Sequence, residues 1–434
     1  MKSKVWIFIF ALLLCNFLSR AQMSQEQKHQ VIDSLCIQLE KCYVFPEVAS
    51  NIALYLKTQL TANAYKAFSK ETTFANKLSL DLFEISGDRH LKVSYSDQIL
   101  PKDSLNPFEL SPEHYLEQGN FALRGNYGID KLEVLNGNIG LIAFSMLCGP
   151  EHAGDTYSAM MNYIGHTDAL IIDLRNCRGA MGKDAIPFLS SYFFNEPVHL
   201  NDFKWRWNNS LEQKWTYAHV PGKRYLDKPI YIINSARTFS GAEELAYDLQ
   251  VLNKATIIGE KTAGGANPGG SIRITDHFEC FIPFGQAINP ITKTNWEGVG
   301  VLPDTPVKAN LALYEAHKMA IRQLIPTTED EEWKFRMEDF LSDLETHPPV
   351  FQRLKFELKG FENAKTVFLT GSFNYWASQN TPMIKKGNIW QVEVECLPGT
   401  VQYQFIVDGI RILDPNNKET IKAGPYVNSI KAVN

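Results

Sequence analysis

The sequence has few cysteines, and their spacing argues against two roles. Its 434 residues include seven cysteines, which are too few and too scattered for a disulfide scaffold or a zinc-ligand pattern. Cys36 and Cys42 lie in one predicted helix, on different faces, so we expect no bridge between them. The sequence therefore predicts buried free thiols and no metal site.

Long apolar runs and blocks of positive charge are also scarce. Beyond the N-terminus no stretch approaches the ~20 apolar residues that span a bilayer, so we expect a protein that does not span a membrane. The formal net charge is −5 and no long basic block is present, which argues against nucleic acid as a partner. A hydrophobic content of 44% is sufficient for packed cores, and the length suggests two or three domains.

Residues 1–21 have the features of a signal peptide. Lys2 and Lys4 precede an apolar run, and Ser19-Arg20-Ala21 resembles a cleavage site with small residues. We therefore expect an exported protein that is periplasmic or extracellular after cleavage. The alternative is a lipoprotein acylated at Cys15, although the leucines before it lack the small residue that this processing normally needs.

The hydrophobic pattern changes along the rest of the chain. Residues 22–86 have a helical periodicity. In residues 87–311 near-continuous apolar strands alternate with helices, which is typical of an α/β structure whose sheet is covered on both faces. Residues 312–349 predict a helical linker that ends at a double proline, and residues 350–434 predict a small β-sandwich of short strands and turns.

Ser240 is the first candidate for chemistry. It follows a predicted buried strand and precedes a helix that begins Gly241-Ala242-Glu243-Glu244. A serine followed three residues later by glutamate fits a helix-capping box. The same position suits a nucleophile, because amides at a helix start can hold the negatively charged oxygen of an attacked carbonyl group. This segment alone leaves both interpretations open.

A nucleophilic serine needs a base, and His90 stands out among the ten histidines. It follows the turn Ser86-Gly87-Asp88-Arg89 and opens a strand, although a histidine beside a strand is more often structural. Glu297 lies in a glycine-punctuated loop, Trp296-Glu297-Gly298-Val299-Gly300. It is either a solvated loop acid or the third member of a triad that orients the base.

A further candidate loop is Asp173-Leu174-Arg175-Asn176-Cys177-Arg178-Gly179-Ala180, which follows the most apolar strand of the chain. A loop at a strand end can present a backbone amide to the oxygen of a substrate. A plain turn from strand to helix is the alternative.

Taken together and in their order along the chain, the four segments resemble those of the tail-specific serine peptidases. These peptidases are related to the C-terminal processing protease, to tricorn and to the repeats of interphotoreceptor retinoid-binding protein. The resemblance covers roughly residues 24–310. It implies a crotonase-like (ClpP/crotonase) spiral α/β core behind a helical N-terminal region.

One branch of this family uses a serine and a lysine, and the position that resembles the lysine is Gly265. The sequence is therefore similar to the tricorn-type branch. This resemblance implies Ser240 as the nucleophile, His90 as its base, Glu297 as the support of the base, and the amides of Gly241 and Gly179 as the oxyanion hole.

The sequence departs from the family pattern at two places. Cys177 and Ala180 replace an asparagine and a glycine of the usual strand-end loop. The interval between Tyr95 and Ile139 is too short for the PDZ domain with which many relatives bind substrate tails. We therefore expect a peptidase core without a PDZ insertion.

Residues 350–434 resemble the glycogen-binding module of AMP-activated protein kinase beta subunits and of starch-branching enzymes, which implies an immunoglobulin-like β-sandwich. The segments that carry the resemblance are 369–376 and 403–409. Trp376 matches one sugar-stacking aromatic residue and Asn428 a polar contact, but the second aromatic falls at Arg411 and the sugar-contacting lysine at Gln404. The resemblance implies weak glucan binding or a docking domain.

The sequence thus favours a serine peptidase that hydrolyses a peptide or protein substrate through an acyl-enzyme at Ser240, without a metal or organic cofactor. Two alternatives stay open. One is a non-catalytic binding protein for an apolar ligand on the same scaffold, and the other is a carbohydrate-recognition factor that depends on the C-terminal domain.

Overall fold

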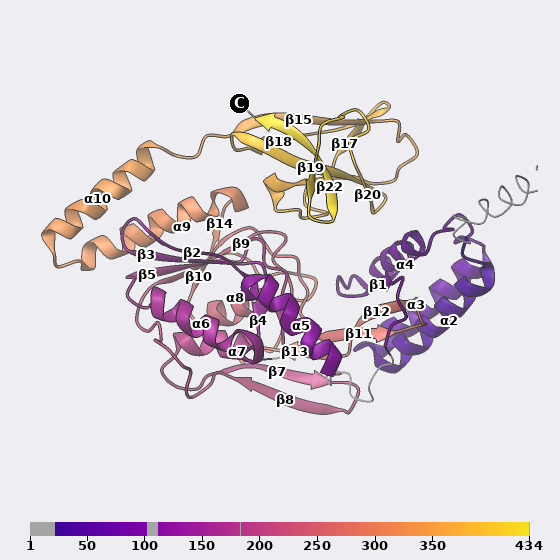
Figure 1. Cartoon of the computed structure of the whole chain (residues 1–434), viewed down its shortest axis with the longest axis horizontal. Helices are drawn as coiled ribbons and strands as arrows, with labels where there is room; N and C mark the ends of the chain where they lie inside the picture. The colour runs from indigo at the N-terminus through magenta and orange to yellow at the C-terminus, as the bar shows by residue number, and fades with distance from the viewer. Residues whose placement is uncertain (1–21, 102–111, 183, 434) are drawn as a thin grey trace, which may run out of the picture.

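The computed structural model describes residues 22–101, 112–182 and 184–433. The predicted signal peptide, residues 1–21, lies outside the described residues. Figure 1 shows an N-terminal group of helices, a central α/β core and a C-terminal module of β-strands.

The N-terminal region is helical, as predicted. A capping box between Ser24 and Gln27 begins the first helix, Pro46 occupies the first turn of the second, and Gly87 ends the third with a φ of 69°. The helices are α2 (Gln25–Cys42), α3 (Pro46–Thr61) and α4 (Glu71–Ser86). The turn after α4 leads into β1 (Lys92–Tyr95) and so places His90 between a helix end and a strand.

A six-stranded sheet forms the centre of the core. Its order is β14 (Thr305–Pro306), β10 (Thr256–Gly259), β9 (Ile230–Asn234), β5 (Ala169–Asp173), β3 (Ile139–Phe144) and β2 (Ile129–Leu135). All neighbours are parallel except the pair β2 and β3. The carboxyl ends of β5 and β9 therefore lie at one edge of the sheet, which is where ligands bind in open α/β sheets.

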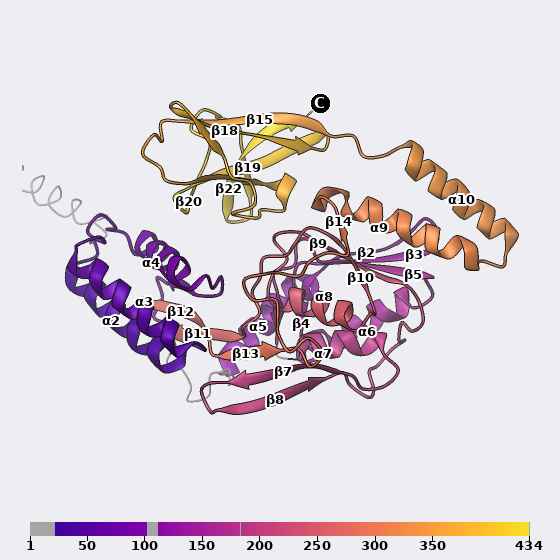
Figure 2. The same cartoon turned by 180° about the vertical axis from the view of Figure 1, so that it is seen from behind.

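Helices cover both faces of this sheet because its strands are apolar on both sides. Ile172 and Ile232 pack into one hydrophobic cluster, whereas their neighbours Ile171 and Ile233 pack into the other. The first face is covered by α6 (Pro150–Ile164), α7 (Ala185–Ser190) and α8 (Gly241–Val251), and the second by α9 (Ala309–Leu324) and α10 (Glu331–Thr346). Figure 2 shows these two layers from behind. The mixed α/β class predicted from the sequence is confirmed.

Smaller sheets complete the core and join it to the N-terminal region. One has the order β1, β12 (Phe278–Pro283) and β11 (Gly269–Arg273), and another has the order β13 (Gly285–Ile288), β7 (His199–Trp205) and β8 (Ser210–Trp215). A short parallel pair links β4 (Leu147–Cys148) to β6 (Ala180–Met181). Because β1 pairs with β12, the N-terminal region contributes a strand to the core.

The described part of the interval between β1 and β3 contains a helix, a 3₁₀ turn and a strand. Its described elements are α5 (Pro112–Arg124), the 3₁₀ turn η2 (Asn126–Gly128) and β2. Residues 102–111 lie outside the description.

The C-terminal module consists of two antiparallel sheets around their own core. The first has the order β15 (Gln352–Lys359), β18 (Ile389–Cys396) and β17 (Ile384–Lys386). The second has the order β16 (Val367–Gly371), β19 (Gly399–Val407), β22 (Tyr426–Val433) and β21 (Thr420–Ala423), with β20 (Ile410–Ile412) paired to β19. Buried side chains of both sheets, including Phe356, Leu369 and Phe405, form one cluster.

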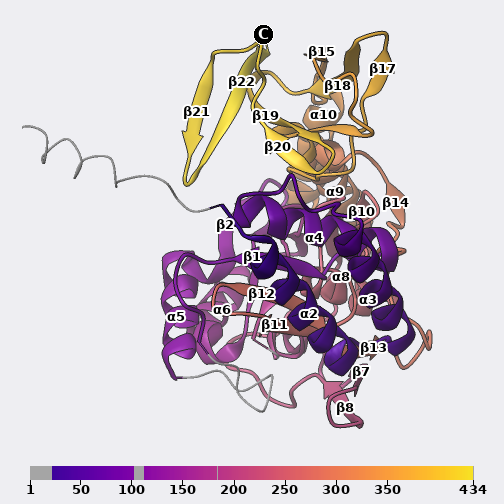
Figure 3. The same cartoon turned by 90° about the vertical axis from the view of Figure 1, so that its right-hand side faces the viewer.

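The module contacts both other parts of the molecule (Figure 3). The amide of Asn380 donates to Glu260 of the core at 3.3 Å, and Lys308 pairs with Glu395 of the module. On the other side, a Cβ atom at Gly409 would lie 2.5 Å from the Leu80 side chain of α4. The loops of the module are therefore packed against the core and the N-terminal helices.

The cysteines of the described residues are free thiols, as expected from the sequence. Cys36 is buried, and Cys42 at the end of the same helix is partly buried. Among the described residues no helix has both the length and the apolar composition needed to cross a membrane.

Candidate active site

Ser240 lies between β9 and α8 in a strained backbone conformation. It occupies the N-cap of α8 with φ 55° and ψ −127°. Residues other than glycine avoid this left-handed region, and they hold it only where the surroundings enforce it, often at functional sites. Its N–H donates to Oε2 of Glu243 at 2.8 Å. The hydrogen bond that the glutamate makes in the predicted capping box, to the backbone N–H of the serine, is therefore present.

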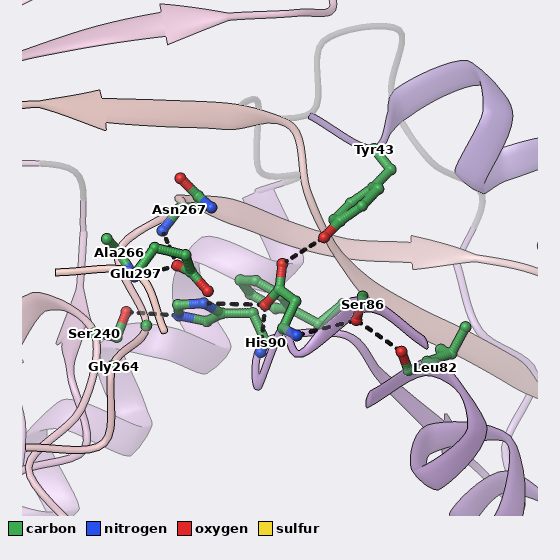
Figure 4. A network of polar contacts seen from close by, with 12 residues as sticks. Tyr43, Leu82, Ser86, His90, Ser240, Gly264, Ala266, Asn267 and Glu297 are labelled. Atoms are coloured by element: carbon green, nitrogen blue, oxygen red, sulfur yellow. Dashed lines mark hydrogen bonds and ion pairs between the residues drawn. The ribbon is translucent and has the colours of Figure 1, made fainter. Parts of the chain in front are cut away.

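The hydroxyl group of Ser240 contacts His90. The distance from Ser240 Oγ to His90 Nε2 is 3.0 Å (Figure 4). These residues are 150 positions apart in the sequence, and β1 with its pairing to β12 brings them together. The serine and the histidine that were predicted separately thus form a hydrogen-bonded pair.

The His90 ring is packed between two aromatic rings. Its centroid lies 4.4 Å from that of Phe239 and 5.5 Å from that of Phe281, and the residue is 8% exposed. Burial lowers the pKa of His90 to about 4, because a buried imidazole disfavours its charged form. At neutral pH the ring is therefore uncharged and able to accept a proton.

Asp88 is the acid beside the other ring nitrogen. Its Oδ1 lies 3.8 Å from His90 Nδ1 and accepts the His90 backbone N–H at 2.8 Å. Its Oδ2 accepts a hydrogen bond from Tyr43 at 3.0 Å. Burial raises the pKa of Asp88. In the sequence this aspartate is visible only as part of a turn, although its position two residues before His90 is a signal for a partner of the ring.

Glu297 belongs to the same polar network but has different hydrogen bonds (Figure 4). Its Oε2 accepts the N–H groups of Ala266 and Asn267 at 2.6 Å and 3.2 Å. Burial, and then the charge of Asp88, raise the pKa of Glu297 to about 7. In the described part of the chain Glu297 has no direct hydrogen bond to His90. Its hydrogen bonds connect it instead to the loop of Ala266 and Asn267.

Glu243 connects the serine to the loop that follows β10. Besides the Ser240 N–H, its carboxylate accepts the N–H groups of Gly264 and Gly265 at 2.6 Å and 2.9 Å and the hydroxyl of Thr262. Glu243 is fully buried, and burial raises its pKa to about 7 against the effect of these donors. The sequence pattern around Glu243 indicates only a helix cap.

Gly265, the position that resembles the lysine of the other branch, has no room for a side chain. A Cβ atom there would lie 2.2 Å from the Phe239 ring and 2.7 Å from Cε1 of His90. The imidazole and its aromatic neighbour therefore fill the space that a lysine side chain would need. A histidine site and a lysine site exclude each other in this geometry.

The two glycines predicted for the oxyanion hole lie next to Ser240. A Cβ atom at Gly179 would lie 3.2 Å from Ser240 Cβ and 3.6 Å from the Gly241 nitrogen. Gly179 has a φ of 132°, a value that L side chains rarely adopt. A Cβ atom at Gly241 would lie 2.6 Å from the Ala180 methyl group, so the two loops are in close contact.

The unusual Cys177 is accommodated behind this loop. It is fully buried, and its Sγ lies 3.6 Å from the carbonyl oxygen of Gly179. Its own carbonyl accepts the N–H of Phe239 at 3.2 Å. The cysteine therefore still connects the loop to the segment that precedes Ser240.

Trp376 and Asn428, the predicted sugar contacts, lie in the C-terminal module. Trp376 is partly buried and has a φ of 62°. Asn428 is 4% exposed, and its amide donates to Gln402 at 3.0 Å. Neither belongs to the hydrogen-bonded group around Ser240. Among the residues with a described structure, no three His, Cys, Asp or Glu side chains are arranged to hold a metal ion.

Three models of known protein families match the chain. Residues 138–307 match peptidase family S41, and residues 23–117 match the N-terminal domain of that family in eukaryotic interphotoreceptor retinoid-binding protein. Residues 354–434 match the glycogen recognition site of AMP-activated protein kinase.

Individual proteins are similar over parts of the chain. Human AMP-activated protein kinase subunit beta-2 is 32% identical over 84 residues, which is 19% of this chain and 28% of the subunit. The chain thus spans little more than a quarter of this curated relative. The mouse subunit is 35% identical over 68 residues, 16% of this chain and 25% of the subunit.

Solved structures are similar at low identity. A lipoprotein from Streptococcus agalactiae has a TM-score of 0.45 and 16% identity, over 71% of this chain and 98% of that one. The photosystem II D1 C-terminal processing protease has a TM-score of 0.40 and 11% identity, over 67% and 94% of the two chains.

The family matches place the chain among the serine peptidases, the class predicted from its sequence. More particularly, it belongs to peptidase family S41, with an N-terminal domain of the interphotoreceptor retinoid-binding protein type and a C-terminal glycogen-recognition module.

Proposed function

We propose that the protein hydrolyses peptide bonds through an acyl-enzyme at Ser240, with His90 as the general base. The contact of 3.0 Å between Ser240 Oγ and His90 Nε2 carries this proposal. The strained backbone of Ser240 and the burial of His90 support it, because both features cost free energy of folding and are concentrated at functional sites.

The reaction begins with proton transfer. His90 Nε2 accepts the hydroxyl proton while Ser240 Oγ attacks the peptide carbonyl carbon, and the negative charge moves to the carbonyl oxygen. The amides of Gly241 and Gly179 donate hydrogen bonds to that oxygen. Gly241 is the first residue of α8, where backbone N–H groups have no partner within the helix.

The acyl-enzyme then forms and is hydrolysed. The imidazolium gives its proton to the leaving amine as the C–N bond breaks, which leaves the acyl group on Ser240. A water molecule loses a proton to His90 and attacks the ester, and Ser240 recovers its hydrogen when the acid product leaves. Asp88 and Glu297 favour the imidazolium that forms in each step, because a nearby negative charge stabilises it.

We infer the finer architecture from the same resemblance. The core of residues 87–311 is a crotonase-like spiral without a PDZ insertion, and residues 350–434 form an immunoglobulin-like sandwich. Residues 22–86 form the helical N-terminal region, residues 312–349 the linker, and residues 1–21 a signal peptide for export. The parallel sheet and the two sheets of the module support these assignments.

A peptide-library digestion tests the proposal. We expect the mature protein to cleave a subset of peptides and the Ser240→Ala variant to cleave none, with products identified by mass spectrometry. The alternative, a non-catalytic carrier of an apolar ligand, predicts saturable ligand binding and no cleavage by either protein. Equal cleavage by both proteins would exclude Ser240 as the nucleophile.

A further inference from the structure

The C-terminal module contacts the segment that carries the proposed nucleophile. Arg237, three residues before Ser240, donates from Nη1 to the carbonyl oxygen of Tyr375 at 2.9 Å. The Tyr375 ring in turn lies 5.0 Å from the guanidinium of Arg175, which is part of the loop that leads to Gly179. One turn of the module therefore touches both loops that form the site.

A second arginine, Arg411 of β20, is bonded to the same turn. Nη2 of Arg411 donates to the hydroxyl of Ser378 at 3.1 Å, and its Nη1 donates to Gln404 at 3.3 Å. Ser378 lies three residues after Tyr375, so Arg411 and Arg237 are attached to one short segment. Arg411 stands at the position of the second sugar-stacking aromatic residue, and Gln404 at that of the sugar-contacting lysine.

Four cationic side chains gather here. The pKa of Arg237 is lowered to about 10, mainly by burial and then by the positive charges of Arg178 and Arg411. The pKa of Lys92 is lowered by burial and then by the same two charges. The pKa of Arg411 is lowered by burial and then by the charge of Arg178. The contacts agree with this: Arg237 and Arg411 are both bonded to the turn that contains Tyr375 and Ser378, and Arg178 belongs to the loop whose Arg175 lies over the Tyr375 ring. We call Lys92, Arg178, Arg237 and Arg411 the cationic cluster.

The cluster has no acidic partner in the described structure. None of its members forms an ion pair with a carboxylate among residues 22–101, 112–182 and 184–433, although ion pairs are present elsewhere in the molecule. The side chains of Lys92, Arg178 and Arg411 reach solvent and Arg237 is partly buried, although Lys92 and Arg411 are also surrounded by enough protein to lower their pKa. Like charges held together without a counter-charge repel one another, so an anion that binds between them is stabilised.

The cluster adjoins the reacting atoms. Arg178 precedes Gly179, whose position lies against Ser240, and Lys92 is two residues from His90. The members come from the N-terminal region, the core and the module, so the cluster exists only when all three are assembled. A substrate group bound here would be held within a few residues of the bond under attack.

We propose that the cationic cluster binds a carboxylate of the peptide substrate and that Arg411 of the module determines this specificity. The proposal rests on the peptidase function and names its substrate class. Guanidinium groups bind carboxylates through charge-assisted, often bidentate hydrogen bonds. An uncharged glucan can accept hydrogen bonds from these side chains but gains no attraction between opposite charges. The face that resembles a sugar-binding site is therefore a wall of the peptide-binding site.

Binding measurements on the Ser240→Ala protein test this without requiring turnover. The probes are three versions of a short fluorescent peptide of alanine and leucine: one with a free C-terminus, one amidated, and one amidated with a single glutamate. We expect one of the two carboxylate peptides to bind about tenfold more tightly than the neutral amide at low salt. The advantage decreases as salt is added. The peptide that binds best shows whether the group is a terminal or a side-chain carboxylate.

Charge reversal identifies the residue responsible. Arg411→Glu in the Ser240→Ala background removes the preference for a carboxylate. The matched control Arg353→Glu, an exposed arginine of the same module that lies beside Glu395, keeps it. Equal binding of all three peptides, or an unchanged preference in Arg411→Glu, would overturn the proposal.

Two outcomes separate this proposal from its alternatives. If a fluorophosphonate fails to label Ser240 of the wild-type protein but the carboxylate preference is present, the peptidase function fails and the binding site stands. If the full chain is retained on a glucan column and Arg411→Glu alone abolishes retention, the surface belongs to a sugar and the carboxylate proposal is wrong.

Discussion

His90 combines two properties that are seldom found together in one side chain. It contacts the Ser240 hydroxyl at 3.0 Å and is buried between Phe239 and Phe281. The burial keeps the imidazole neutral at physiological pH. A neutral imidazole is the form that can remove a proton from serine.

The pH profile of kcat/KM should show two steps. Glu297, with a pKa of about 7, loses its charge as the pH falls below neutrality, and activity decreases because the imidazolium is less stabilised. His90, with a pKa of about 4, remains a base until the pH falls through that value, where activity is lost. In Glu297→Gln the step near pH 7 should become smaller, and what is left of it belongs to Glu243, whose pKa is also about 7. A single step near pH 6.5, the usual pKa of histidine, would contradict the assignment.

Asp88 and Glu297 should contribute unequally to kcat. Asp88 lies 3.8 Å from His90 Nδ1, whereas Glu297 hydrogen-bonds to backbone N–H groups that an amide oxygen could also serve. We expect Asp88→Asn to lower kcat by roughly 100-fold or more, as for the aspartate of a triad. Glu297→Gln should lower kcat by less than about tenfold, with little change in KM for either variant. If Glu297→Gln lowered kcat more than Asp88→Asn, Glu297 and not Asp88 would be the main residue that positions His90.

Individual side chains of the site were predictable to different extents. Ser240, His90 and Glu297 were named because they match family motifs, and the glycine at 265 indicated the histidine branch. The supporting roles of Asp88 and Glu243 were not predicted. Both depend on contacts across the fold, such as that of Asp88 with Tyr43, and an acid in a turn or helix cap has the same local pattern without such contacts.

At the scale of elements, the start of α8 and the loop after β10 are joined by one buried carboxylate. Glu243 accepts from Ser240 and from two residues of that loop, Gly264 and Gly265. The loop in turn packs against His90. The positions of the base and the nucleophile therefore depend on this connection.

Glu243→Gln should destabilise the fold and separate these elements. The amide NH₂ group would face donors where an acceptor is needed, which leaves buried groups without partners and costs about 2–4 kcal/mol in the free energy of unfolding. Chemical denaturation measures the loss. As a control, the exposed Glu47→Gln in the first turn of α3 should change stability by less than about 0.5 kcal/mol. A neutral effect of Glu243→Gln would contradict the role of this carboxylate.

Regular elements were predicted best where their periodicity was strong. The strands β3, β5 and β9 and the helix α8 follow continuous apolar runs or helical patterns, and the structure confirms them. The helix α6 begins at Pro150, and its first turns contain polar residues and glycine, so the helical pattern of apolar residues is weak there. The start of the helix is set by the proline in its first turn, where a residue without an N–H group is tolerated.

At the scale of the whole molecule, the C-terminal module is packed onto the active-site loops. Tyr375 links it to Arg175 and Arg237. The sequence predicted the module and its β-rich character but not its location, because residues such as Arg237 and Tyr375 carry no local signal of their contact. A module that resembles a sugar binder thus comes to lie beside the segment of Ser240 only through tertiary packing.

Tyr375→Ala should loosen this packing. Loss of the contact between the ring and Arg175 removes about 1–2 kcal/mol from the interface, so the module should detach more often. Limited proteolysis between Thr346 and Gln352 should become several times faster. Phe335→Ala on α10, an aromatic side chain that is 70% exposed, serves as the control and should leave the rate unchanged. Equal rates for wild type and Tyr375→Ala would show that Tyr375 does not hold the module.

The most direct test of the central claim is covalent labelling of the mature full chain with a fluorophosphonate, mapped by mass spectrometry. The account predicts one labelled residue, Ser240, with no labelling in Ser240→Ala and labelling at least about 100-fold slower in His90→Ala. Labelling of another residue, or equal rates in wild type and His90→Ala, would contradict a serine nucleophile activated by His90.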